Sequence, residues 1–162
     1  MIKVIEGDLL HAKSQIIVQL VNEDGDLHKN IPDYINNDYH HITKEYIKYI
    51  NFCRKKNREI SGSCVYIPLD VWALGLVDTT KNNYIDTYDK DFKYIASAFA
   101  LEKVGKKYKV NISALKECLT DICMKAQSVH ADVVIMYSDI VYKIVQEVCE
   151  NSSVNIYLVK ED

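Results

Sequence analysis

Two short segments of the sequence end in polar residues that are able to bind a ligand. Asp8 follows the apolar run Ile2–Ile5. Asn22 follows a second apolar run, Ile16–Val21. Both runs are too short for helices and rich in β-branched residues, so we expect each to form a strand. Ligands of open α/β sheets bind beyond the carboxyl ends of the strands, so Asp8 and Asn22 are predicted to offer a carboxylate and an amide to a ligand at that edge.

Both side chains also have a purely structural interpretation. Asp8 comes directly after Gly7, and a short acid at such a position often turns the chain by bonding its own backbone. Asn22 stands at a strand end, where asparagine is common as a loop residue. The sequence leaves both interpretations open.

The rest of the chain alternates between predicted strands and predicted helices. Further strands are expected at Cys64–Ile67, Phe92–Phe99, Asp132–Tyr137 and Val154–Val159. Helices are expected near Pro32, from a Thr43 cap to about Asn57, after an Asn111 cap, and after a cap at Ser138 or Asp139. Residues 69–91 give no clear prediction beyond a strand at 72–77. This alternation predicts one domain over residues 1–162, with a three-layer α/β/α fold and a mixed, largely parallel sheet.

Composition and charge exclude several classes of protein. The chain has 162 residues, 48% of them hydrophobic and 27% charged, which is typical of one folded globular domain. No apolar run is long enough to cross a membrane, and the first residues lead directly into a predicted strand, so we expect neither a membrane span nor a signal peptide. The formal net charge of −3 gives no general attraction to nucleic acid, which is not expected as a partner.

The cysteines and histidines form no recognisable metal site. The five cysteines include no C-x-x-C pair and no zinc-ligand spacing, and an odd number without an export signal indicates reduced, mostly buried thiols in a cytoplasm. The strongest metal candidates are His28, Asp38, His40 and His41. Adjacent histidines point apart and no further ligand follows at a suitable spacing. We therefore expect no metal, no cofactor and a cytoplasmic location.

Tyrosine is frequent, with twelve in the chain. Four of them gather around one predicted helix: Tyr34, Tyr39, Tyr46 and Tyr49. Tyrosine on a partly buried face belongs either to the edge of a core or to an interface, and we favour the core.

Four short segments, in order and at matching spacing, resemble one known family. They are Gly7-Asp8-Leu9-Leu10, the strand that runs into Val21-Asn22, Lys93-Tyr94-Ile95-Ala96-Ser97-Ala98-Phe99-Ala100-Leu101, and Val154-Asn155-Ile156-Tyr157-Leu158. The pair Ala114-Leu115 followed by Leu119 also matches the helix that lies between the last two segments. The third is similar to the motif K-Y-I-A-N-L-F-x-Q of the macro domains, the family that binds ADP-ribose. The likeness is greatest to the small phage and bacterial members that process ADP-ribose-1''-phosphate, and it covers nearly the whole chain.

The first glycine loop of the family is degenerate in this sequence. In the family, its glycines let backbone N–H groups approach the ribose and diphosphate, because a Cβ would block the approach. Here His28, Lys29 and Asn30 occupy those positions, and only Gly25 remains.

The second glycine loop of the family is missing. The predicted strand that ends at Tyr137 leads directly to Ser138, with no glycine between them. The N and Q of the third motif are Ser97 and Leu101. Each hydrogen bond to a charged oxygen contributes about 1.5–3 kcal/mol. The loss of two or three would weaken ADP-ribose binding by roughly 3–6 kcal/mol, on the order of a hundred- to ten-thousand-fold.

What the resemblance retains is the adenine side of the pocket. It implies that Asp8 accepts the adenine amino group, that the backbone of Leu9 lies beside it, and that Asn22 lies near the distal ribose. The remaining candidate contacts are Gly25, Ser97 and Ser138.

These observations favour a non-catalytic module that binds an ADP-ribose-related or other adenine nucleotide through the retained adenine end. The alternative is a pseudoenzyme scaffold that keeps only the fold and binds a protein partner, for instance a phage counter-defence factor that acts against a bacterial defence system in the host cytoplasm. An ADP-ribosyl hydrolase is the third hypothesis, and the missing second glycine loop argues against it.

Overall fold

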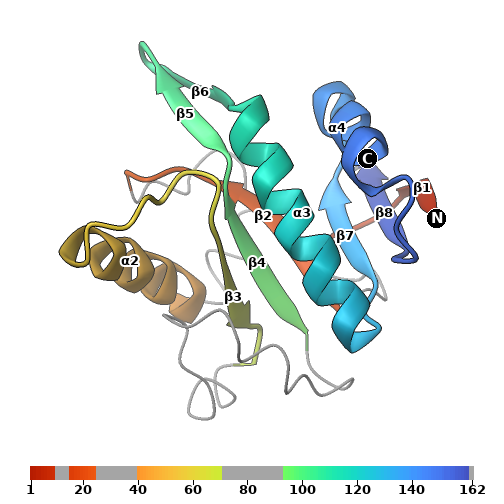
Figure 1. Cartoon of the computed structure of the whole chain (residues 1–162), viewed down its shortest axis with the longest axis horizontal. Coiled ribbons are helices and arrows are strands. Elements are labelled where there is room, and N and C mark those ends of the chain that lie inside the picture. The colour runs from red at the N-terminus through yellow and green to blue at the C-terminus, as the bar shows by residue number, and fades with distance from the viewer. Residues whose placement is uncertain (10–14, 25–39, 71–92, 161–162) are drawn as a thin grey trace.

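The computed structural model describes residues 1–9, 15–24, 40–70 and 93–160, which form a six-stranded sheet with helices packed on both faces (Figure 1). The strands of this sheet are β1 (Ile2–Glu6), β2 (Ile16–Val21), β3 (Cys64–Pro68), β4 (Tyr94–Phe99), β7 (Val133–Met136) and β8 (Ile156–Lys160). The helices are α2 (His40–Lys55), α3 (Ile112–Val129) and α4 (Asp139–Cys149). A separate two-stranded hairpin consists of β5 (Leu101–Val104) and β6 (Lys107–Val110).

The sheet is mixed and largely parallel, as the sequence predicts. Its order is β1-β8-β7-β2-β4-β3, and only β3 runs antiparallel to its neighbour, β4. All six predicted strands belong to it, and their described ends differ from the prediction by at most two residues. The strand predicted at Cys64–Ile67 extends one residue further, to Pro68, and a proline is tolerated there because β3 lies at the edge of the sheet. The predicted α/β fold class is confirmed.

Two hydrophobic cores lie on opposite faces of the sheet. Successive side chains of a strand alternate between faces, so in β2 Ile16 and Val18 pack in the core under α3 and α4, while Ile17 and Val21 pack in the core under α2. Both faces are buried, which explains why β2 and β4 are mostly apolar rather than alternating, with Gln19 and Ser97 as their polar residues.

The helix caps were partly predicted. Asn111 is the N-cap of α3, and its side-chain oxygen accepts a hydrogen bond from the backbone N–H of Ala114 at 3.0 Å. Ser138 caps α4 in the same way through the N–H of Val141. The prediction for Thr43 is wrong: α2 already begins at His40, so Thr43 lies inside the helix.

Replacement of Asn111 by alanine should lower the free energy of unfolding by about 0.5–2 kcal/mol, because the N–H of Ala114 loses its acceptor. Asn111→Ser keeps a side-chain oxygen as acceptor without placing a second carboxylate beside Glu102, and should restore most of the loss. Urea denaturation of both variants, with the exposed Ser128→Ala as control, measures the difference. Equal stability of Asn111→Ala and the unaltered protein would contradict the capping role.

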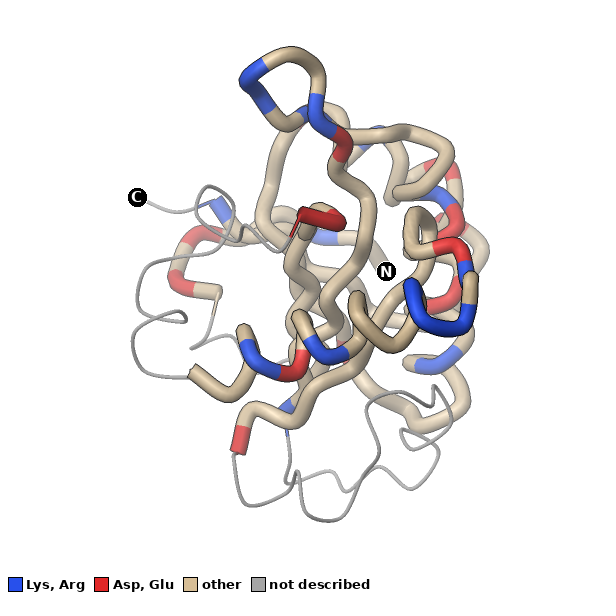
Figure 2. The backbone as a smooth tube through the Cα atoms, turned by 90° about the vertical axis from the view of Figure 1, so that its left-hand side faces the viewer, with Lys and Arg blue, Asp and Glu red and all other residues tan. Residues whose placement is uncertain are grey.

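The β5–β6 hairpin was not predicted as strands. The sequence indicates only its turn, where Gly105 has the left-handed φ of 65° that favours glycine. The hairpin extends from the carboxyl end of β4 and carries several lysines (Figures 1 and 2). The Tyr108 hydroxyl donates a hydrogen bond to Asp24 Oδ2 at 2.9 Å, which ties the hairpin to the loop after β2. The predictions for a helix near Pro32 and for a strand at 72–77 lie outside the described residues.

Candidate functional site

The carboxyl ends of β2 and β7 form a topological switch point. The two strands are neighbours in the sheet, but the chain continues from β2 towards β4 and β3, and from β7 through α4 towards β8. Their register pairs join Ile16–Val18 to Val133–Ile135. Within the described residues, the strands have no further pair beyond Val18 and Ile135. Open α/β sheets bind ligands at such a point.

Three of the predicted site residues lie at this edge of the sheet. Asp8 follows β1, Asn22 follows β2 and Ser138 follows β7, and these strands are parallel. Asp8 is half-buried, whereas the neighbouring Leu9 is buried in the core on the α2 face. The carboxylate predicted to meet adenine therefore lies at the same edge as the switch point.

Ser97 lies away from the other candidates. It is in the middle of β4, is fully buried, and accepts a hydrogen bond from Gln19 Nε2 at 2.6 Å. The other side-chain atom of this amide, Gln19 Oε1, is buried and has no hydrogen-bond partner among the described residues. Gly25, with His28, Lys29 and Asn30 of the first loop, lies outside the described residues.

The start of the loop after β2 is held by several contacts. Asn22 is buried, and its side-chain oxygen accepts a hydrogen bond from the backbone N–H of Asp24 at 2.9 Å, an arrangement typical of a turn. The hydroxyl of Tyr46 donates to the Asn22 carbonyl oxygen. Arg54 Nη2 donates to the Glu23 carbonyl oxygen at 2.9 Å. Helix α2 therefore positions Asn22 and fixes the direction in which the loop leaves the sheet.

Aromatic rings connect α2 to the end of β4. Tyr46 and Tyr49 both stack on Phe99, each with ring centroids 5.5 Å apart. Burial raises the pKa of Tyr49 above its usual range, although the hydrogen bond to Ser63 opposes this shift. Tyr46 and Tyr49 belong to the core, which confirms the favoured interpretation for these two tyrosines.

The junction between β7 and α4 differs from a phosphate-binding loop. Ser138 Oγ accepts the N–H of Val141 at 3.3 Å, and Asp139 places a carboxylate in the first turn of α4. This carboxylate accepts a hydrogen bond from the Tyr137 hydroxyl at 2.9 Å, which raises the pKa of Tyr137. A diphosphate at this helix end would meet a like charge, so the arrangement disfavours phosphate here.

Lys160 provides a positive charge at the same edge. Its Nζ lies 4.5 Å from the centroid of the Tyr137 ring, at the end of β8. This contact was not predicted. The sequence signal for it is only that a lysine directly follows the last predicted strand, Val154–Val159.

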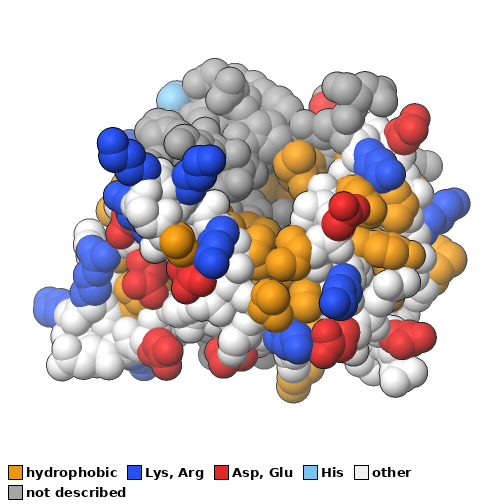
Figure 3. Space-filling view, turned by 90° about the horizontal axis from the view of Figure 1, so that it is seen from above, with side chains coloured by type: hydrophobic (Ala, Val, Ile, Leu, Met, Phe, Trp, Pro, Cys, Tyr) orange, Lys and Arg blue, Asp and Glu red, His pale blue; other side chains and the backbone are white. Residues whose placement is uncertain are grey.

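Exposed apolar side chains also lie on the face at the carboxyl ends of the strands. Figure 3 shows this face from above, with hydrophobic side chains across its middle and right and with Lys and Arg on both sides of them. Val104, Ile112 and Ile140 are 49%, 46% and 36% exposed and belong to the hairpin and to the first turns of α3 and α4.

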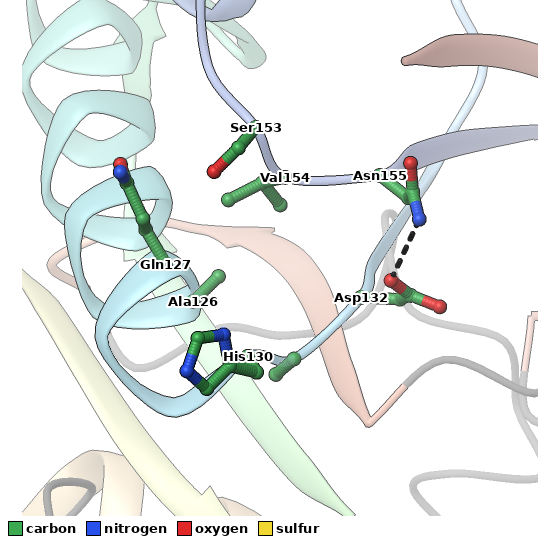
Figure 4. A pocket seen from close by; sticks show the side chains of 8 residues that line it. Ala126, Gln127, His130, Asp132, Ser153, Val154 and Asn155 are labelled. Atoms are coloured by element: carbon green, nitrogen blue, oxygen red, sulfur yellow. Dashed lines mark hydrogen bonds between the residues drawn. The ribbon is translucent and has the colours of Figure 1, made fainter.

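A small polar cavity lies at the opposite edge of the sheet, where β7 and β8 begin (Figure 4). Its volume is about 160 Å³, and its lining includes His130, Asp132 and Asn155. Asn155 Nδ2 donates to Asp132 Oδ1 at 3.3 Å. Ligand pockets usually measure about 300–1,000 Å³, so this cavity does not compete with the carboxyl edge as a nucleotide site.

Two further tests concern metals and membranes. Within the described residues, no three His, Cys, Asp or Glu side chains are grouped so that they could hold a metal ion. His41 Nε2 instead lies 2.9 Å from the Pro68 carbonyl oxygen. None of the helices in the described ranges has the length and apolar character needed to cross a membrane.

Comparison with known proteins gives matches only among solved structures; no protein-family model and no curated protein sequence matches the chain. A macrodomain protein from Streptomyces coelicolor has a TM-score of 0.75 at 12% identity, over 100% of both chains. The macrodomain of Thermus aquaticus DarG has a TM-score of 0.68 at 16% identity, over 99% of this chain and 98% of that one. Thermosipho africanus DarTG in complex with ADP-ribose has a TM-score of 0.64 at 12% identity, over 99% of this chain and 41% of that one. The described part of the chain therefore has a macrodomain-like fold.

Proposed function

We propose that the protein is a non-catalytic module that binds an ADP-ribose-related or other adenine nucleotide at the carboxyl edge of its sheet. The observation that carries this proposal is the position of Asp8, half-buried at the same edge as the switch point between β2 and β7. The likeness of the fold to a protein solved in complex with ADP-ribose supports the class of ligand.

The adenine end of the ligand supplies most of the binding free energy in this proposal. The Asp8 carboxylate accepts a hydrogen bond from the exocyclic amino group of adenine, which contributes about 1.5–3 kcal/mol. The end of α4 contributes little to phosphate binding, because Ser138 already accepts one of its N–H groups and Asp139 is acidic. Adenosine should therefore bind nearly as tightly as ADP-ribose, and inosine, which has a carbonyl in place of the amino group, should bind more weakly.

The thermal stability of the full chain tests this proposal. A nucleotide at a hundred times its dissociation constant stabilises the folded state by about 2.7 kcal/mol, which raises the melting temperature by roughly 5–10 °C. We expect this rise with adenosine and ADP-ribose, and its loss in Asp8→Ala. Glu6→Ala is the matched control, because it removes an exposed carboxylate two residues earlier in the chain.

Two outcomes would overturn nucleotide binding. One is an unchanged melting temperature at millimolar concentrations of every adenine nucleotide. The other is an equal rise in the unaltered protein and in Asp8→Ala, because Asp8 would then have no part in the site.

The module should not release ADP-ribose from modified proteins or nucleic acids. The reason is the short connection from Tyr137 to Asp139, which has no glycine loop to hold the diphosphate while the distal ribose reacts. Incubation with ADP-ribosylated substrates, followed by chromatography of the released nucleotide, measures the activity. Release that is abolished by Asn22→Ala would show that the protein is a hydrolase.

A scaffold that binds a protein partner is the second candidate. The side-chain oxygens of Asn22 and Ser138 accept hydrogen bonds from nearby backbone N–H groups, and exposed apolar side chains lie at the same edge. A phage factor directed at a bacterial defence system is one form of this function. In that case Asp8→Ala should lower the free energy of unfolding by about 0.5–2 kcal/mol, as the loss of a cap does, and no nucleotide should change the melting temperature.

A further inference from the structure

We propose that Cys123 and Cys149 are a redox-active pair whose oxidation forms a disulfide between α3 and α4. Both thiols are free, and their Sγ atoms lie 2.8 Å apart. A disulfide bond is about 2.05 Å long, so the two sulfur atoms need to approach by only about 0.8 Å. The residues are 26 positions apart, so the packing of the two helices creates the pair rather than a local motif.

The two helices hold the pair inside a core. Cys123 lies in α3 and Cys149 is the last residue of α4, and the helices lie side by side on one face of the sheet (Figure 1). Both sulfur-bearing side chains belong to the core on that face. Core packing restricts the rotation of each side chain, so the short distance between the sulfur atoms is maintained rather than occasional.

The environments of the two cysteines differ, and this difference assigns the order of reaction. The two Sγ atoms share a hydrogen bond in which either thiol can donate, and this bond lowers the pKa of the Cys123 thiol and raises the pKa of Cys149. Cys123 is also the more accessible, at 8% exposed against 1% for Cys149. Cys123 is therefore the nucleophile, and Cys149 is the thiol that resolves the intermediate.

Two other cysteines, Cys64 and Cys118, have environments that keep them as thiols. Burial raises the pKa of Cys118 to about 12, and its Sγ donates to the Ser63 carbonyl oxygen at 3.3 Å. Burial also raises the pKa of Cys64 well above its usual value. Cys53 is buried in α2, on the other face of the sheet.

Hydrogen peroxide is the oxidant in this proposal. The Cys123 thiolate attacks one peroxide oxygen, the O–O bond breaks, and the departing hydroxide takes up a proton to become water. Cys149 Sγ then attacks the sulfur of the resulting Cys123 sulfenic acid, the S–S bond forms, and the released hydroxide takes the proton of Cys149. In total, two thiols give two electrons and two protons to one peroxide, which yields one disulfide and two waters.

The disulfide should stabilise the fold without altering the candidate site. It joins α3 to the last residue of α4, whereas Ser138 lies at the opposite end of that helix, which is 11 residues and about 16 Å long. A disulfide that closes a loop of this length stabilises the folded state chiefly by restricting the unfolded chain. A change in nucleotide response on oxidation is therefore not expected, which separates this proposal from the proposed function.

The experiment treats the reduced full chain with one equivalent of hydrogen peroxide, then denatures and alkylates it. We expect an intact mass lower by two hydrogens before alkylation, and three alkylated cysteines where the reduced protein has five. Mapping without reductant should recover one peptide pair that joins Cys123 to Cys149, and dithiothreitol should reverse the change. The melting temperature should rise on the order of 5–10 °C on oxidation.

Matched variants decide between this pair and any other. Cys123→Ala and Cys149→Ala should each abolish the cross-link and the rise in melting temperature, whereas Cys53→Ala should keep both. Five alkylated cysteines after oxidation, a cross-link between other cysteines, or a lower melting temperature of the oxidised protein would each overturn the proposal. If a variant does not fold, the peptide map of the unaltered chain still shows whether the cross-link joins Cys123 to Cys149.

Discussion

Replacement of Tyr46 by alanine should lower the free energy of unfolding by about 3–5 kcal/mol, as the loss of a large buried aromatic side chain usually does. The side chain is fully buried, and its ring stacks on Phe99 with centroids 5.5 Å apart. Its hydroxyl donates to the Asn22 carbonyl oxygen at the end of β2. The variant therefore leaves a cavity between α2 and the sheet. It also removes the hydrogen bond that holds the start of the loop after β2.

Tyr46→Phe separates these two contributions. It keeps the stacked ring and removes only the hydrogen bond to the Asn22 carbonyl, so it should cost about 0.5–1.5 kcal/mol. Chemical denaturation measures both variants, and Ile47→Ala is the control because Ile47 is the next residue of the helix and is 40% exposed. A loss in Tyr46→Ala no larger than that in Ile47→Ala would contradict the role of the aromatic layer.

The buried pair of Gln19 and Ser97 should show strong coupling in a double-mutant cycle. Ser97→Ala removes the acceptor of Gln19 Nε2, while Gln19 Oε1 has no partner among the described residues, so this variant should lose about 1–3 kcal/mol. The double variant Gln19→Met with Ser97→Ala replaces both polar groups with apolar ones of similar shape. It should be more stable than Ser97→Ala by about 1–3 kcal/mol, although it carries one more substitution.

The measurement is the free energy of unfolding of the four proteins in the cycle. Two independent losses that simply add would contradict the coupling. The resemblance to macro domains gives asparagine at the position of Ser97, and serine is shorter. The Ser97 hydroxyl pairs with Gln19 Nε2, and Gln19 Oε1 has no hydrogen-bond partner among the described residues.

Most of the sheet was predictable because its strands are buried on both faces. Ile16–Val21 is apolar except for Gln19, rich in β-branched residues and too short for a helix, so the pattern favours a buried strand. The caps Asn111 and Ser138 were predictable because a short polar residue precedes an apolar repeat of three or four residues. Thr43 shows the limit of this signal, because the helix begins three residues earlier, at His40. A threonine inside a helix cannot be distinguished in the sequence from a threonine that caps it.

The β5–β6 hairpin and the contacts around the site were not predictable. The hairpin strands have only four residues each, half of their residues are charged and none is buried, so they are too short and too polar to indicate strands. The hydrogen bond from Tyr46 to Asn22 and the pair Cys123–Cys149 join residues 24 and 26 positions apart. Which side chains meet in these two contacts depends on how a helix packs against a strand or against another helix. No local sequence pattern specifies that packing.

The pairing of β1 with β8 has a consequence for synthesis on the ribosome. Strand β1 pairs with β8 along its whole length, from Ile2 with Ile156 to Glu6 with Lys160. Strand β1 is therefore translated long before its partner β8. Until β8 leaves the exit tunnel, β1 cannot join the sheet and the edge of β7 lies open. Unpaired edges of this kind promote aggregation of incomplete chains. The exposed Lys3 and Glu6 place charges on β1 while it is still unpaired. These charges reduce the tendency of β1 to pair with strands of other nascent chains.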